Sequence, residues 1–225
     1  MGTSRLRPDT VLGSKYRIRE FVAQGGMGTV YSARHLNLGI DVAVKTLNTS
    51  DTPESGLTEV HKYQLDAEAR LMMLVDHENV VRIFDFGEPQ EVEFNDRKTR
   101  RVHYLVMEWV SGKPLDSYAG GTPMAWREAL LVALQIVRAL RAIHEHGVVH
   151  RDISPGNCMV VHARTFRTDR CPALAGPFLK VLDFGIAKQR TTRGGLGWKQ
   201  PNYTPGYAPP EHKQGSPEAS YDIYS

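Results

Sequence analysis

The chain has 225 residues, of which 41% are hydrophobic and 24% are charged, a composition typical of a folded globular protein and not of a disordered or fibrous one. Its 28 Lys and Arg residues outnumber its 25 Asp and Glu residues by three, and a net charge of +3 gives no reason to expect nucleic acid as a partner. Two cysteines supply neither a disulfide framework nor the paired ligands of a zinc site, which favours a cytoplasmic location. The longest apolar run, residues 129–134, is much shorter than a membrane span, and the N-terminus lacks the hydrophobic core of a signal peptide.

The first half of the chain is rich in predicted strands. Short alternating or β-branched segments occur at residues 17–22, 29–34, 40–47, 80–86 and 102–109. An amphipathic helix is predicted over residues 63–75, where Leu65, Ala69, Met72 and Val75 recur at helical spacing and Glu68 lies on the same apolar stripe. Residues 48–58 and 88–101 are expected to be solvated loops.

The second half of the chain is predominantly helical in its pattern. The clearest helix is predicted over residues 126–146, with Pro123 near its start and Gly147 just after its end. Residues 162–177, rich in Arg and Pro, are interpreted as a surface insertion loop. A strand-rich segment followed by a helix-rich one predicts an α+β architecture with two lobes. The long helix is expected to form one apolar face from Trp126, Leu130, Ala133, Val137 and Leu140.

A group of glycines lies in the predicted hairpin between the first two strands. Gly25, Gly26 and Gly28 carry no side chains that would keep backbone N–H groups away from a bound phosphate. A plain turn between two strands explains the same glycines. Their position between strands, and not between a strand and a helix, argues against a dinucleotide-binding fold.

Lys45 ends an apolar strand, where a lysine either extends into solvent or needs an anionic partner for a buried amino group. Glu68, on the apolar stripe of the predicted helix, needs a cation for the same reason. Each of the two residues therefore supplies the charge that the other lacks.

An ordered set of polar residues gives the strongest chemical signal. The segment His150-Arg151-Asp152-Ile153-Ser154-Pro155-Gly156-Asn157 is followed by Leu182-Asp183-Phe184-Gly185. An aspartate and an asparagine five residues apart, followed by a second aspartate before a glycine, provide hard oxygen ligands for magnesium and one carboxylate that is free to accept a proton. Each of these residues alone is also explained as a turn or capping residue. Their order, together with the glycines and Lys45, makes chance a poor explanation.

These motifs resemble the signature of the protein kinase family, and most closely that of bacterial Ser/Thr kinases, from about residue 16 onward. The resemblance implies a two-lobe protein kinase-like α+β fold with a small β-rich N-lobe and an incomplete helical C-lobe. It implies an N-terminal tail at residues 1–15, an N-lobe with glycine-rich loop and C-helix at 16–110, and a partial C-lobe with catalytic loop and activation segment at 111–225. The implied cofactors are ATP and Mg²⁺.

The resemblance also implies a role for each site residue. Lys45, held by Glu68, contacts the α- and β-phosphates of ATP, and Asp152 accepts the proton of the substrate hydroxyl. Asn157 and Asp183 hold magnesium. Thr204, in a segment that resembles the peptide-positioning loop, favours a protein substrate with a Ser or Thr acceptor. The nucleotide is expected to contact Gly25, Gly26, Gly28, Val30, Ala43, Met107, Met159 and the backbone of Glu108 and Val110.

Ser154 departs from the family pattern, because it occupies the position of the catalytic-loop lysine that steadies the γ-phosphate. One hypothesis is an active Ser/Thr protein kinase, favoured by the other catalytic residues that are present. The alternative is a pseudokinase, a nucleotide-binding or scaffolding module with little turnover. A small-molecule phosphotransferase of kinase-like fold is a weaker alternative, because such enzymes lack the peptide-positioning segment.

The last residues, 221–225, resemble the start of the helix that runs through the centre of the kinase C-lobe. In that resemblance, Asp222 anchors the backbone of the catalytic loop. A kinase domain that stops here is truncated, and we expect it to expose apolar faces of the helix at 126–146 and to aggregate. The sequence predicts no oligomeric state.

Overall fold

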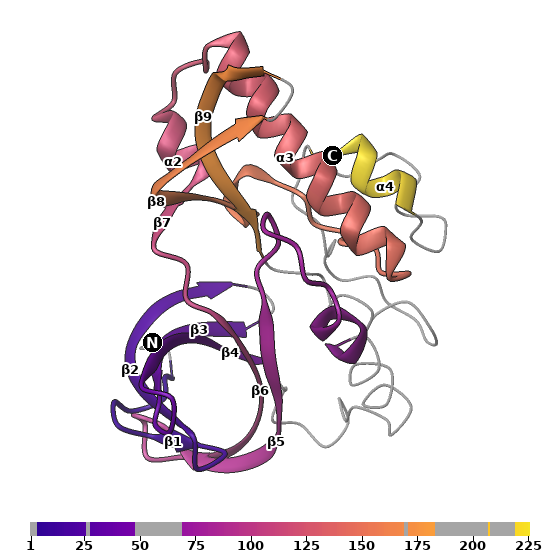
Figure 1. The fold of residues 1–225 in the computed structure, drawn as a ribbon. Helices are drawn as coiled ribbons and strands as arrows, with labels where there is room; N and C mark the ends of the chain where they lie inside the picture. Colours follow the sequence, from indigo (N-terminus) through magenta and orange to yellow (C-terminus); the bar gives the residue numbers. More distant parts are fainter. Residues whose placement is uncertain (1–3, 26–27, 48–68, 169–170, 183–206, 208–218) are drawn as a thin grey trace. The chain divides into compact units, whose positions relative to one another are not determined.

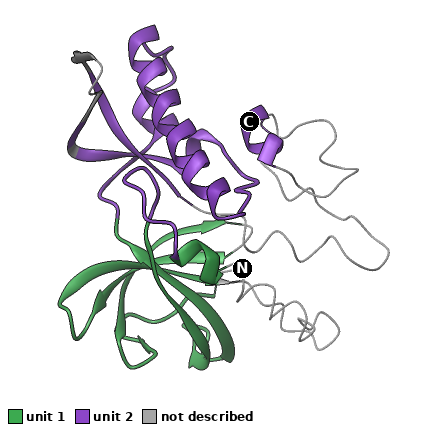
Figure 2. Cartoon of the chain, turned by 45° about the vertical axis from the view of Figure 1, so that its right-hand side comes forward, with its two compact units in different colours: residues 1–73, 82–109 green, residues 74–81, 110–225 purple. Residues whose placement is uncertain are grey.

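The structure is a computed structural model that describes residues 4–25, 28–47, 69–168, 171–182, 207 and 219–225. The chain divides into two compact units (Figure 2), the first formed by residues 1–73 and 82–109 and the second by residues 74–81 and 110–225. Among the described residues, no helix combines the length and the hydrophobicity that a membrane crossing needs.

The first unit is built on a six-stranded antiparallel sheet with the strand order β1-β2-β3-β4-β6-β5, which curves around one core (Figure 1). The five predicted strands are confirmed, and most of them are longer than expected. Residues 69–73 form the described part of the predicted helix. The strands are β1 (Val11–Leu12), β2 (Tyr16–Gly25), β3 (Gly28–His35), β4 (Ile40–Leu47), β5 (Ile83–Glu93) and β6 (Thr99–Glu108).

The core of this sheet is formed by every second residue of its strands, because successive side chains of a strand point to opposite faces. Tyr31 and Ala33 on β3, Val42 and Val44 on β4, and Val106 on β6 are each at most 1% exposed. They belong to a single apolar cluster. The face that carries these residues is therefore the structural face of the sheet, and the opposite face is available for other contacts.

The N-terminal segment, expected as a tail at residues 1–15, contributes to this unit from its first described residues. Val11 and Leu12 form β1 and pair with β2, and Leu6 forms a β-bridge with Phe94. Leu6 is 4% exposed and Leu12 is fully buried. Single leucines among polar, proline and glycine residues show no periodicity, so the pattern gave no sign of this packing.

The prediction of a solvated loop at residues 88–101 is wrong, because most of this segment is a hairpin. β5 and β6 stay paired as far as Glu93 and Thr99. The turn is closed by a hydrogen bond of 3.0 Å from the Phe94 N–H to the Lys98 carbonyl, with Arg97 at a φ of 63°. Val92 and Phe94 alternate inward while charged neighbours face solvent, and these charges concealed the strand pattern.

The second unit combines a three-stranded antiparallel sheet, in the order β7-β8-β9, with helices. Figure 1 shows α3 lying along β9 and α4 lying beside α3, and both pairs of elements are in contact. The elements are β7 (Gly112–Pro114), α2 (Leu115–Ala119), α3 (Trp126–Glu145), the 3-10 turn η2 (Pro155–Asn157), β8 (Cys158–Thr168), β9 (Cys171–Val181) and α4 (Ala219–Tyr224).

The prediction of an insertion loop at residues 162–177 is also wrong, since β8 and β9 extend through most of this segment as paired strands. Phe178 of β9 packs against Leu131 of α3, and the Arg164 guanidinium lies 3.7 Å from the Phe178 ring centroid. A Cβ atom on Gly176 would lie 2.9 Å from Leu131 Cδ1, so the close approach of β9 to α3 depends on this glycine. Arg164, which covers the Phe178 ring, is one of the residues that gave the segment its loop-like composition.

The predicted ends of the long helix are confirmed, and its predicted apolar face lies mostly on the solvent-exposed side of the helix. Trp126, Leu130 and Val137 are 70%, 57% and 55% exposed. Apolar residues surround much of the helix, so spacing alone did not show which side meets β9. The buried residues are Leu131, Val132, Gln135, Ala139, Leu140 and Ile143, of which only Leu140 was expected.

Candidate active site

Four residues predicted to contact a nucleotide share one face of the sheet in the first unit. Val30 on β3 is the cross-strand partner of Lys45 on β4, and Ala43 on β4 is the partner of Met107 on β6. Ala43 and Lys45 are two residues apart on one strand, and directly opposed residues point to the same side. The four side chains therefore lie on the face opposite the apolar core, where Ala43 and Met107 are 7% and 9% exposed.

Lys45 is a buried cation, with 5% of its surface exposed. Such burial excludes the interpretation of a lysine that simply extends into solvent. Its predicted partner Glu68 lies outside the described residues, so the ion pair remains a prediction. The helix that follows Glu68 has the expected inward face, because Ala69 and Met72 are at most 1% exposed.

The glycines of the predicted phosphate-binding hairpin lie where β2 and β3 meet. Gly25 pairs with Gly28, and Gly26 lies outside the described residues. A Cβ atom on Gly25 would meet nothing within 4 Å among the described residues, and the φ of Gly25 is outside the left-handed region. Among the described residues, neither packing nor backbone conformation demands glycine at position 25.

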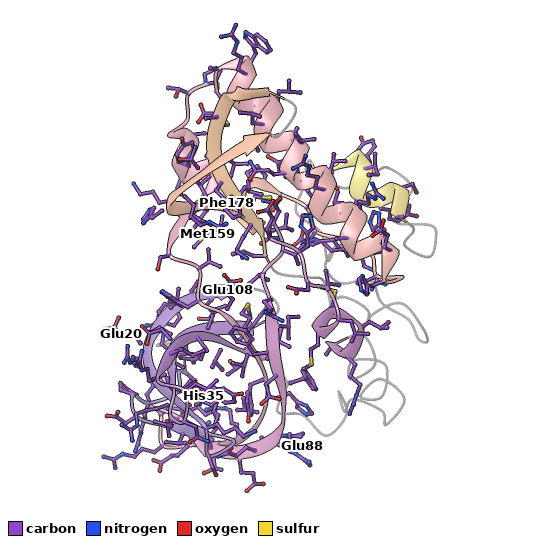
Figure 3. All side chains as sticks on the ribbon, viewed as in Figure 1. Glu20, His35, Glu88, Glu108, Met159 and Phe178 are labelled. Carbon is purple, nitrogen blue, oxygen red and sulfur yellow. The ribbon has the colours of Figure 1, made fainter. Side chains whose placement is uncertain are left out.

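Glu108 ends β6, as Figure 3 shows, at the edge of the first unit. Its backbone N–H donates to the Arg82 carbonyl at 2.9 Å, so this N–H is already engaged within the sheet. Val110 belongs to the second unit and is 9% exposed.

The catalytic loop of the second unit brings Asp152 and Asn157 together. Asn157 Nδ2 donates to the Asp152 carboxylate oxygen Oδ2 at 3.0 Å and to the Asp152 carbonyl at 2.8 Å. The backbone on both sides is fixed, because the Asn157 N–H donates to the Ser154 carbonyl at 3.0 Å and the Leu182 N–H donates to the Asn157 carbonyl at 2.8 Å. Among the hydrogen bonds of the described residues none uses Asn157 Oδ1, which leaves a hard oxygen next to the Asp152 carboxylate.

A buried histidine and a buried aspartate hold the backbone of this loop by hydrogen bonds. His150 is fully buried, its Nε2 donates to the Leu182 carbonyl at 2.7 Å, and its Nδ1 accepts the Asp152 N–H at 3.3 Å. Asp222 of α4 accepts the backbone N–H groups of His150 and Arg151, each at 2.7 Å. The predicted anchoring role of Asp222 is thereby confirmed.

Ser154, at the position of the family lysine, is 7% exposed and has an extended backbone with φ −157° and ψ 159°. A Cβ atom on Gly156 would lie 4.0 Å from both Ser154 Oγ and an Asp116 carboxylate oxygen, so Asp116 of α2 borders the same loop. Asp183, the second predicted metal ligand, lies outside the described residues.

Met159, predicted to lie below adenine, is on β8 opposite Lys180 of β9 (Figure 3). Its side chain borders Gly112 of β7, where a Cβ atom would lie 3.1 Å from Met159 Cγ. The neighbouring Cys158 is buried, and desolvation raises the pKa of its thiol to about 12. Cys158 is therefore not a nucleophile at neutral pH.

The sequence analysis did not predict a buried polar network between Asn79, α3 and β9. Gln135 of α3 and Asn79 are both fully buried, and Asn79 Nδ2 donates to Gln135 Oε1 at 3.1 Å. Gln135 Oε1 also accepts the Leu179 N–H of β9 at 2.9 Å, and Asn79 Nδ2 donates to the Leu179 carbonyl at 2.7 Å. A lone glutamine inside an apolar helical pattern was the signal for this network, which fixes residues 74–81 to α3 and β9.

The family model described as "Protein kinase domain" matches residues 16–225, and the chain belongs to the protein kinase family. The serine/threonine-protein kinases Pkn1 and pkn2 of Myxococcus xanthus are 38% and 33% identical to it over 77% and 98% of this chain. The serine/threonine-protein kinase PknA of Mycobacterium tuberculosis is 34% identical over 81% of this chain. The chain spans 22%, 24% and 37% of the lengths of these three relatives.

Solved structures show the same fold. The PknI kinase domain of Mycobacterium tuberculosis matches with a TM-score of 0.64 at 19% identity, covering 96% of this chain and 72% of that one. The α+β, protein kinase-like fold that the sequence predicted is thus confirmed, with a strand-rich N-terminal part and few helices after it.

Proposed function

We propose that this protein is an ATP- and Mg²⁺-dependent Ser/Thr protein kinase that transfers the γ-phosphate of ATP to a hydroxyl group of a protein substrate. The observation that carries the proposal is the hydrogen bond of 3.0 Å from Asn157 Nδ2 to the Asp152 carboxylate. It orients a proton acceptor and leaves Asn157 Oδ1 beside it for a cation.

In this proposal Asp152 accepts the proton of the substrate hydroxyl. Asn157 Oδ1 and a carboxylate oxygen of Asp183 hold magnesium, for which two hard oxygen ligands are suitable. Magnesium, when bound, offsets the negative charge of the phosphoryl group that is transferred. Asp222 and His150 keep the loop in place, so that little reorganisation is needed at the moment of transfer.

The first unit supplies the nucleotide contacts. Lys45, held by Glu68, contacts the α- and β-phosphates, and the backbone at Gly25, Gly26 and Gly28 covers them. The adenine ring lies against apolar side chains, and backbone groups meet its polar edge. In the first unit the apolar contacts are Val30, Ala43 and Met107, and the backbone group is that of Glu108.

A pseudokinase is the second candidate, because Ser154 stands where the family has its catalytic-loop lysine. A serine hydroxyl supplies no positive charge to the γ-phosphate. In this alternative the chain binds nucleotide or a partner protein, and turnover is small.

We place the reaction in the cytoplasm with a protein as the acceptor, and we expect no nucleic acid partner. The support is the near balance of charges over the chain and the reduced, buried thiol of Cys158.

Phosphotransfer with γ-labelled ATP, Mg²⁺ and a generic acceptor such as casein tests the proposal on the 225-residue chain. We expect the parent to label Ser or Thr residues of the acceptor and Asp152→Asn to lose this labelling. Lys113→Met, which alters an exposed lysine of β7, is the control and is expected to label the acceptor to the same extent as the parent. Binding of a fluorescent ATP analogue with no labelling by the parent would identify the pseudokinase instead.

A further inference from the structure

Four residues near the N-terminus, Ser4, Arg5, Leu6 and Arg7, form what we call the N-terminal strap. On one side the strap is tied to the turn between β5 and β6. The Arg5 N–H donates to Asn95 Oδ1 at 2.9 Å, the Asn95 N–H donates to the Arg5 carbonyl at 2.9 Å, and Leu6 bridges Phe94.

Two ion-pairing residues add to this side of the strap. Arg100 donates to Ser4 Oγ at 2.7 Å while it pairs with Asp96 at 2.7 Å, and Arg7 pairs with Glu93 at 2.6 Å. Exposed pairs of this kind contribute little energy individually, but together they give the strap one defined path.

The other side of the strap contacts a pair of aromatic residues on β2 and β3. The Arg5 guanidinium lies 3.5 Å from the Phe21 ring centroid, and the Leu6 N–H donates to the Tyr31 hydroxyl at 3.0 Å. Phe21 and Tyr31 are direct cross-strand partners, and their rings meet edge to face with centroids 6.4 Å apart. The strap therefore spans from the β5–β6 turn to the strands that carry the glycines.

The Tyr31 hydroxyl connects the strap to the base of the glycine hairpin. Tyr31 lies two residues after Thr29, the residue that follows Gly28, so the side chains of Thr29 and Tyr31 share one face of β3. Thr29 and Tyr31 are 5% and 1% exposed, and burial raises the pKa of Tyr31, so this phenol stays protonated as a hydrogen-bonding group. Val30 lies between them and points to the opposite face, toward the predicted nucleotide.

We infer that Arg5, Leu6 and Tyr31 are positioning residues, through which the N-terminal strap holds the base of the glycine hairpin in the conformation that binds ATP. The inference rests on the proposed function for its ligand. The contacts tie both strands of the hairpin within a few residues of Gly25 and Gly28. Loosening the strap therefore lowers nucleotide affinity, while the phosphotransfer groups Asp152 and Asn157, in the second unit, are unaffected.

Two mild variants of the 225-residue chain test this inference by the Kd of a fluorescent ATP analogue. Tyr31→Phe keeps the ring and removes the hydroxyl, and Arg5→Ala removes the guanidinium over Phe21. Loss of one such contact is expected to raise the Kd about threefold to tenfold. Arg5→Lys keeps the cation and is expected to restore most of the affinity. Arg19→Ala, which breaks an exposed ion pair between Arg19 of β2 and Asp41 of β4, is the matched control and is expected to keep the parent Kd.

A saturating-ATP measurement of kcat completes the kinetic test, because a positioning role predicts a changed Kd with a kcat within about twofold of the parent. If the Kd of the ATP analogue is the same for Tyr31→Phe and Arg5→Ala as for the parent, the inference is overturned. An equal rise of the Kd in Arg19→Ala would overturn it as well, since general destabilisation of β2 would then be the cause.

Amide hydrogen exchange without nucleotide separates this inference from the proposed function. The amides of residues 23–25 and 28–30 are expected to exchange at least about threefold faster in Tyr31→Phe than in Arg19→Ala. Unchanged exchange would refute the strap whether or not the parent is a kinase. If exchange is faster in Tyr31→Phe but the parent neither binds nor hydrolyses ATP, the proposed function is refuted. The role of the strap in holding the hairpin is then still supported.

Discussion

The carboxylate of Asp222 accepts the backbone N–H of Arg151 at 2.7 Å, and Arg151 has a φ of 68°. This value lies in the left-handed region, which a residue with a Cβ atom seldom adopts without support from its surroundings. The same carboxylate accepts the His150 N–H at 2.7 Å and meets His144 Nε2 of α3 at 2.8 Å. One buried residue of α4 thus holds the backbone that leads directly into Asp152.

The first prediction is that Asp222→Ala lowers the free energy of unfolding by about 2–4 kcal/mol, because it leaves the buried His150 N–H and the partly buried Arg151 N–H without their acceptor. Asp222→Asn keeps an acceptor oxygen and is expected to lose about half as much. Urea denaturation followed by circular dichroism measures both values. Glu145→Ala removes an exposed partner of Arg141 and should leave the midpoint unchanged. Equal midpoints for Asp222→Ala and the parent would contradict the anchoring role.

Sequence patterns predicted much of the fold where one physical signal dominated. β4 carries core residues such as Val44 next to residues of the opposite face such as Lys45, and its predicted bounds, residues 40–47, match the structure. The catalytic loop was predictable because its chemistry needs particular polar residues in a particular order. The strap was not, because the burial of Leu6 depends on a partner, Phe94, that is 88 residues away in the chain.

Other parts were mispredicted because composition suggested the opposite of the packing. β9 contains two prolines and a glycine, yet Gly176 is required by the approach to Leu131 and Pro177 accepts a hydrogen bond from Gln135 Nε2 at 2.8 Å. The face of α3 was ambiguous, since Leu130 and Leu131 are neighbours with opposite environments. Only tertiary contacts distinguish them.

The second prediction separates nucleotide binding from phosphotransfer. Asp152→Asn is expected to lower kcat about 100-fold to 10,000-fold, because it removes the proton acceptor, and to keep the Kd of ATP within about threefold. Lys45→Met keeps the length of a buried side chain and removes the phosphate contact, so it is expected to weaken ATP binding as well. Titration with a fluorescent ATP analogue and single-turnover kinetics measure the two effects. Equal Kd values for Lys45→Met and the parent would reject Lys45 as a phosphate ligand.

The third prediction concerns Ser154, the departure from the family pattern. Ser154→Lys is expected to raise kcat about tenfold, since one preorganised positive charge near the transferring group stabilises the transition state. Ser154→Met matches the length without the charge and is expected to give no increase. Steady-state phosphotransfer compares the three proteins. A rate for Ser154→Lys no higher than that for Ser154→Met would mean that positive charge at this position is not what limits turnover.

The fourth prediction tests the packing of β7 on β8. A Cβ atom on Gly112 would lie 2.2 Å from the backbone oxygen of Val160, which cannot move without breaking the strand pairing. Gly112→Ala is therefore expected to lower the free energy of unfolding by about 2–4 kcal/mol. Gly156→Ala is the matched control, because its Cβ atom would have no neighbour closer than 4.0 Å among the described residues. Equal urea midpoints for the two variants would show that β7 is not held in this register.

The last prediction concerns the exposed apolar side of α3. Trp126, Leu130 and Val137 lie on one side of the helix and are more than half exposed, a combination that promotes self-association in water. Leu130→Lys is expected to reduce light scattering and the fraction of large species in sedimentation velocity, with a free energy of unfolding within about 0.5 kcal/mol of the parent. Leu131→Lys, one residue along and 3% exposed, places a charge against Phe178 and is expected to unfold the second unit. Self-association that is unchanged in Leu130→Lys would show that another surface of the chain is responsible.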